Sequence, residues 1–166
     1  MHHPSSAMAA GLTLVREPYA DPGPQWVVAQ AEAELVVRYG YLHEGERGLT
    51  PGMFDPPAGA FVVARAGAAG PPIGGVGVRA LDQEPGRGEI RRLWVDPDRR
   101  GEGLARRLME AIEQVALDLG LTALKLITGP NQPEAVALYA SSGWTPDPSN
   151  SASNGFRFTK ELVATS

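Results

Sequence analysis

Two glycines separated by one residue mark the part of the chain whose residue types and spacing could do chemistry. Gly101 and Gly103 follow a short apolar stretch ending at Val95 and precede a segment with the apolar spacing of one helix face. A strand that leads through such a loop into a helix presents backbone N–H groups without intrahelical partners. Anions bind there, and the helix dipole adds about 0.3–1 kcal/mol. The spacing therefore predicts a phosphate-binding loop.

Arginine is concentrated around this loop, although the chain as a whole is acidic. The formal net charge of −4 at pH 7 argues against nucleic acid as the main partner. A basic cluster in an acidic protein favours a small phosphorylated ligand, but a solvent-exposed surface of ion pairs has the same composition. The cluster consists of Arg87, Arg91, Arg92, Arg99, Arg100, Arg106 and Arg107.

Two common nucleotide-binding motifs do not fit the loop. A dinucleotide fingerprint needs a glycine or alanine where this chain has Arg106, and a carboxylate after the next strand, where residues 126–129 offer none. A P-loop needs Lys followed by Ser or Thr after its last glycine, and the loop lacks that pair. The phosphate is therefore expected to belong to another kind of ligand.

Other kinds of site have little support in the sequence. The absence of cysteine excludes thiolate metal sites and cysteine nucleophiles, and we predict no metal. For His43, solvent exposure is a simpler interpretation than catalysis. No apolar run approaches the roughly 20 residues that span a bilayer, and the N-terminus lacks the features of a signal peptide. We therefore expect a cytoplasmic protein without a membrane partner.

The hydropathy pattern predicts a single domain over residues 11–166, preceded by a flexible tail of residues 1–10. A strand over residues 12–16 leads into a helix that starts near Asp21 and stops at Gly40. A long loop with a helical turn follows. Three strands then form an antiparallel meander, over residues 60–66, 73–81 and 89–95.

The second half of the domain alternates helices and strands. A long helix is predicted over residues 103–119, and the strand after it, over residues 124–128, should run parallel to residues 90–95. A helix over residues 133–142 and a strand over residues 156–162 complete the domain. This order predicts an α+β fold with a mixed, mostly antiparallel central sheet flanked by helices.

A second pattern lies 30 residues after the end of the glycine loop. Ala135, Tyr139 and Gly143 recur at every fourth position, and Trp144 follows directly. With R-x-x-G-x-G/A over residues 100–105 and the order of elements, this pattern resembles the GNAT family of N-acetyltransferases. The resemblance covers about residues 60–162. The first 55 residues are less constrained, as is common for the substrate-binding part of that family.

The resemblance implies the GNAT fold and acetyl-CoA as co-substrate. The pyrophosphate would lie on the backbone N–H groups of the loop, where glycine lets it approach without a Cβ in the way. Arg99 or Arg100 would add charge-assisted hydrogen bonds. The cofactor-binding residues of this region would be Arg99, Arg100, Gly101, Glu102, Gly103, Leu104 and Ala105.

The resemblance also places the pantetheine arm beside the strand that ends at Val95. The arm would bind like an added strand along Leu93, Trp94 and Val95, and the Leu93 amide would polarise the thioester carbonyl. Packing in the core is the alternative role of Trp94. An amide side chain would bind the arm from the later helix; the family's asparagine position is Gln132 here, with Asn131 one residue earlier, and both remain open.

Two residues are candidates for proton transfer. A lysine-like amine has a pKa of about 10.4 and a cysteine-like thiol one of about 8.5, so a base should matter more than an acid at neutral pH. Glu89 stands where some GNAT enzymes have a catalytic glutamate, and it would act directly or through water. Tyr139 would protonate the departing sulfur. The alternative roles are an ion pair of Glu89 with Arg87 or Arg91, and packing of Tyr139 against the long helix.

Together these inferences predict an N-acetyltransferase in which a primary amine attacks acetyl-CoA directly in a ternary complex. The acceptor would be a small amine, an amino acid, an aminoglycoside-like polyamine or a protein amino group, and acidic residues in the early loop would suit a cationic one. The rival hypothesis is a CoA-binding sensor that kept the fold and lost transfer. A homodimer stays open, and the preference for Arg over Lys suggests a bacterial source.

Overall fold

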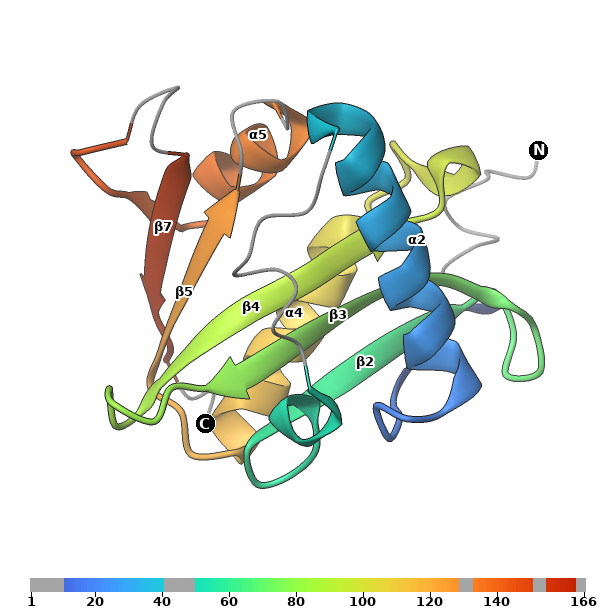
Figure 1. Cartoon of the computed structure of the whole chain (residues 1–166), viewed down its shortest axis with the longest axis horizontal. Helices are drawn as coiled ribbons and strands as arrows, with labels where there is room; N and C mark the ends of the chain where they lie inside the picture. The colour runs from blue at the N-terminus through green and yellow to red at the C-terminus, as the bar shows by residue number, and fades with distance from the viewer. Residues whose placement is uncertain (1–10, 41–49, 129–132, 151–154, 164–166) are drawn as a thin grey trace.

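The computed structural model describes residues 11–40, 50–128, 133–150 and 155–163. These residues form one sheet that runs through the molecule (Figure 1). Its strands lie in the order β1 (Thr13–Arg16), β2 (Gly59–Arg65), β3 (Pro72–Ala80), β4 (Arg87–Val95), β5 (Ala123–Thr128), β7 (Phe156–Glu161) and β6 (Thr145–Pro146). Only β4 and β5 pair in parallel, so the predicted α+β fold with a mostly antiparallel sheet is confirmed.

Helices cover both faces of this sheet. The helix α2 (Pro22–Tyr39) lies over one face, and α4 (Leu104–Asp118) and α5 (Pro133–Ser141) pack into the core on the other. A proline occupies the first position of α2, and the left-handed Gly40 ends the helix, its N–H donating to the Val36 carbonyl over 2.6 Å. Both ends agree with the prediction from sequence.

Two apolar cores result from this arrangement. The larger core lies between the sheet and α4, whose buried residues Leu104, Leu108, Ile112 and Val115 repeat at helical spacing. The smaller core lies between the sheet and α2. Strand β2 serves both cores because alternate residues point to opposite faces: Val62 faces α4, whereas its neighbours face α2.

Close packing explains two glycines of β3. A Cβ on Gly75 would lie 2.9 Å from Cγ1 of Val27, and one on Gly77 would lie 2.8 Å from the ring of Phe54. Phe54 ends the short helix η1 (Pro51–Phe54), which is the helical turn predicted in the long loop. A side chain at either position would therefore collide with the core on the α2 side.

A β-bulge in β4 has the largest consequence for the rest of the molecule. Between the pairs Gly77–Arg91 and Gly75–Trp94, β4 contains one residue more than β3. Arg92 lies in this bulge and has a φ of 58°, a value that residues other than glycine rarely adopt. A bulge bends its strand and increases the local twist, so β4 turns away from β5 at this point.

The parallel pairing of β4 with β5 is accordingly short. It covers Arg87–Glu89 against Ala123–Lys125 and then stops. The prediction that β5 runs parallel to β4 is confirmed, but its placement along residues 90–95 is wrong, because the bulge separates the strands there (Figure 1). The short strand β6 was not predicted, and the predicted tail and residues 41–49 lie outside the described residues.

Within the described ranges, no helix combines the length and apolar character that a membrane crossing requires.

Candidate active site

A cavity of about 990 Å³ lies where β4 and β5 diverge. Its walls come from both strands, from the loop before α4, and from α2 and α5. The cavity brings together most of the predicted site residues, namely Glu89, Leu93, Trp94, Val95, Arg99, Arg100, Gly101, Gly103, Leu104, Ala105 and Tyr139. Glu102 is not part of the wall, and Asn131 and Gln132 lie outside the described residues.

The wall formed by β4 is an open strand edge. Beyond Glu89, no other strand of the described chain pairs with β4 on the β5 side. Backbone groups on an unpaired edge bind an extended, peptide-like ligand as an additional strand. One acceptor of this edge is already used, because Nε of Arg100 donates to the Val95 carbonyl over 3.0 Å.

The loop before α4 faces open space. Gly101 and Gly103 have φ values of 85° and 83°, and a Cβ on either would meet no atom within 4 Å. The first N–H groups of a helix have no intrahelical partner, and no side chain caps those of α4. The geometry therefore fits the anion-binding loop predicted from the sequence.

A chain of ion pairs crosses one side of the cavity. Glu34 accepts a hydrogen bond from Nη2 of Arg100 over 2.7 Å and another from Arg38 over 3.2 Å, and Arg38 also pairs with Glu134 over 2.5 Å. Burial alone would raise the pKa of Glu34, but the two guanidinium groups outweigh burial and leave the pKa below its ordinary value. These pairs connect α2, the glycine loop and α5.

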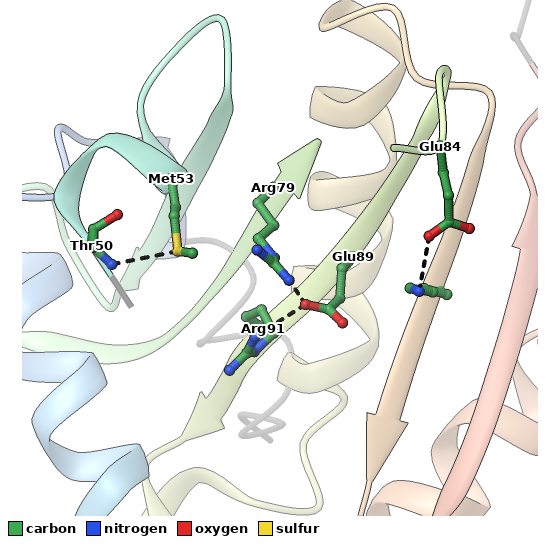
Figure 2. A network of polar contacts seen from close by, with 7 residues as sticks. Thr50, Met53, Arg79, Glu84, Glu89 and Arg91 are labelled. Carbon is green, nitrogen blue, oxygen red and sulfur yellow. Dashed lines mark hydrogen bonds and ion pairs between the residues drawn. The ribbon is translucent and has the colours of Figure 1, made fainter. Parts of the chain in front are cut away.

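Glu89 lies in the wall between two arginines. Its Oε1 accepts from Nε of Arg79 over 3.0 Å and from Nη1 of Arg91 over 3.1 Å, while Oε2 points away from both (Figure 2). The ion pair with Arg91 was one alternative from the sequence, whereas Arg87 pairs with Glu84 instead. Two charge-assisted bonds hold the carboxylate in place, and its catalytic role stays a prediction.

Tyr139 is buried at the opposite wall. Its ring centroid lies 5.5 Å from that of Phe158 on β7 and 6.0 Å from that of Trp144. Burial raises the pKa of the phenol above its ordinary value. The hydroxyl is therefore protonated at neutral pH and can act there as a hydrogen-bond donor.

The side chain of Trp94 packs in the core, which was the alternative role considered from the sequence. The indole is buried in the core on the α2 side and makes an edge-to-face contact with Trp26 at 5.4 Å. Trp94 nevertheless lines the cavity wall that β4 forms.

Three contributions to the site had no local signal in the sequence. Glu34 and Arg79 reach the site through partners on other elements, and Thr128 ends β5 in the cavity wall. Only a three-dimensional arrangement could reveal these roles. Among the described residues, no three metal-binding side chains of the His, Cys, Asp and Glu types gather at one point.

Comparison with known proteins gives consistent matches. The model of the acetyltransferase (GNAT) family matches residues 16–144. An IAA acetyltransferase from Azospirillum brasilense is 43% identical over 84 residues, which cover 51% of this chain and 53% of that protein. N-acetyltransferase 8 from Rattus norvegicus is 35% identical over 106 residues, which cover 62% and 47%. The chain thus spans about half the length of these curated relatives.

Solved structures show the same fold. A GNAT-family acetyltransferase from Staphylococcus aureus Mu50 aligns with a TM-score of 0.72 at 11% identity, covering 92% of this chain and 100% of that one. An IAA acetyltransferase from Bacillus cereus ATCC 14579 aligns with a TM-score of 0.63 at 19% identity, with the same coverage. At these identities the likeness concerns the fold alone.

Proposed function

Because the chain belongs to the acetyltransferase (GNAT) family, we propose that it transfers an acetyl group from acetyl-CoA to a primary amine by direct attack in a ternary complex. The observation that carries this function is the unpaired edge of β4, which faces a cavity of about 990 Å³ and leads to the glycine loop. An extended thioester cofactor with a pyrophosphate needs both features in that order.

The residues present fit acetyl-CoA. The loop offers N–H donors beside space that a Cβ would partly fill, which suits the pyrophosphate. Leu93 and Val95, two residues apart on β4, offer backbone groups to the amides of the pantetheine arm. Asn131 or Gln132 would hydrogen-bond the arm through its amide side chain, as the family pattern implies. Arg100 is anchored by Val95 and Glu34, so Arg99 is the freer source of a phosphate contact.

The reaction forms one bond and breaks another. The amine nitrogen attacks the thioester carbonyl carbon, the new C–N bond replaces the C–S bond, and the nitrogen loses a proton while the sulfur gains one. The backbone N–H of Leu93 would stabilise the charge that develops on the carbonyl oxygen, and such a donor contributes about 10²–10³ in rate. Each proton then needs a group that accepts or donates it.

Glu89 and Tyr139 would serve the two protons. Because both arginines bind Oε1 of Glu89, Oε2 stays available to accept the proton of the amine, directly or through water. The raised pKa keeps Tyr139 protonated, so its hydroxyl can donate to the leaving sulfur. Glu89 lies on β4 and Tyr139 on α5, so the two groups approach the cavity from different walls.

A screen of amines tests the function. The full chain is incubated with acetyl-CoA and, in separate mixtures, with small amines, amino acids, an aminoglycoside or a lysine-containing peptide. A further mixture contains IAA, the compound in the names of the two IAA acetyltransferases. We expect thiol release matched by acetylated product for one class of acceptor. Binding of acetyl-CoA without thiol release in any mixture would support a sensor instead, and absence of binding would contradict both functions.

A further inference from the structure

Thr128 carries a buried hydroxyl that the fold does not use. The residue is the last of β5 and only 6% exposed, and it lines the cavity. Its Oγ1 is buried without a hydrogen-bond partner anywhere in the described chain. A hydroxyl in this state loses its bonds to water and gains nothing from the protein. Valine would fill nearly the same volume without that loss, so packing alone does not explain a threonine here.

The side chain lies on the cofactor side of the sheet. Leu124 and Leu126 pack in the core against α4, and Thr128 is the next residue on the same face of β5. Phe158 pairs with Leu126 and contacts the ring of Tyr139, so α5 covers this face as well. The hydroxyl therefore lies on the same face as Tyr139, across the gap from the open edge of β4.

The two walls of the gap do not offer the same set of groups to a ligand. Beyond the short paired stretch both strand edges offer backbone N–H and C=O groups, and the end of β5 adds a side-chain hydroxyl beside apolar residues. A threonine hydroxyl both donates and accepts, and rotation about Cα–Cβ exchanges its position with that of the methyl group. An amide in the gap could therefore bond to both walls at once.

We propose that Thr128 is a positioning residue whose hydroxyl binds an amide of the pantetheine arm from the β5 side. This role rests on the proposed function, because it requires acetyl-CoA in the gap. The hydroxyl fixes the position of the arm in the gap between β4 and β5. It thereby aligns the thioester carbonyl with the backbone N–H of Leu93. The unpaired hydroxyl destabilises the ligand-free protein, and the ligand relieves this by supplying the missing partner.

A pair of substitutions separates this role from simple packing. Thr128→Val keeps the shape and removes the hydroxyl, whereas Thr128→Ser keeps the hydroxyl and removes a methyl group. We expect Thr128→Val to unfold at a higher temperature than wild type without ligand, yet to bind acetyl-CoA about tenfold more weakly, a factor equal to about 1.4 kcal/mol. Thr128→Ser should bind within about threefold of wild type, since its hydroxyl still reaches the amide.

Acetyl-pantetheine locates the contact. This fragment lacks the pyrophosphate, so its affinity should fall by the same factor in Thr128→Val if the hydroxyl binds the arm. Wild-type affinity for acetyl-CoA in Thr128→Val, or equal weakening in both variants, would overturn the role. A wild-type chain that binds no acetyl-CoA would instead contradict the proposed function, and with it this role.

Discussion

The two sides of the cavity are built in different ways. On the side of the glycine loop, the groups offered to a ligand are backbone N–H groups held by local conformation, with Gly101 and Gly103 at positive φ. On the side of α2, they are charged side chains joined over long distances in sequence. Glu34 pairs with Arg100 over 66 positions, and Arg92 pairs with Glu32 over 60.

This difference separates two kinds of recognition. A backbone site accepts any ligand that presents the right phosphate and amide groups, because it depends little on side-chain identity. A side-chain site can change its charge and shape through single substitutions. We therefore assign the loop side to the invariant cofactor, and we expect the α2 side to select the acceptor.

Glu89→Gln is expected to have the largest effect of any side-chain substitution in the cavity. If Oε2 accepts the proton of the amine, the substitution should lower kcat/KM at neutral pH by about 10²–10⁴, the range of general-base catalysis. The acidic limb of the pH–rate profile should also disappear, because glutamine does not titrate. Steady-state rates over a range of pH, with a good acceptor, provide the measurement.

Glu84→Gln is the control for this substitution. Glu84 is also an ion-paired carboxylate near β4, with Lys125 at 3.1 Å, but it does not line the cavity. Its replacement should leave the pH–rate profile unchanged. A Glu89→Gln variant that keeps the acidic limb would assign the base to water or to another group.

Tyr139→Phe should have the next largest effect. A thiolate is a tolerable leaving group at neutral pH, so loss of the donor should lower kcat by about 10–10² while the Kd for acetyl-CoA stays within about twofold. Since burial raises the pKa of Tyr139, the group stays protonated as pH rises, and the wild-type profile should show no alkaline limb from it below about pH 10. Wild-type turnover in this variant, where chemistry limits the rate, would remove the donor role.

Gly103→Ala tests the side of the glycine loop, and Gly120→Ala, after the end of α4, is its matched control. Their φ values are 83° and 86°, and a Cβ on either would meet no atom within 4 Å. Both variants should therefore lose about 1–2 kcal/mol of stability from the left-handed conformation. Only Gly103→Ala should weaken acetyl-CoA binding, by about tenfold or more, because one weakened bond to phosphate is worth about 1.5–3 kcal/mol. If calorimetry gave the two variants equal affinities for acetyl-CoA, the pyrophosphate would not bind at this loop.

The same division explains what could be predicted from the sequence. The glycine loop and the start of α4 are local, so their spacing indicated them, whereas the pattern around Tyr139 was indicated by the resemblance to the GNAT family. The separation of β4 from β5 depends on the bulge at Arg92, a non-glycine residue at positive φ for which the sequence carries no local sign. The pairing of Glu89 with Arg79 depends on the register of β3 against β4, which hydropathy does not define to one residue.

Thermal unfolding with acetyl-CoA tests the central claim most directly, namely that the gap between β4 and β5 and the glycine loop form one cofactor site. At 100 times the Kd, acetyl-CoA should stabilise the chain by about 2.7 kcal/mol, which raises the melting temperature of a domain this size by about 5–11 °C. Acetyl-pantetheine, which fills the gap but not the loop, should require a much higher concentration for the same shift. Equal shifts for both ligands at equal concentration, or no shift with millimolar acetyl-CoA, would contradict a single cofactor site formed by the gap and the loop.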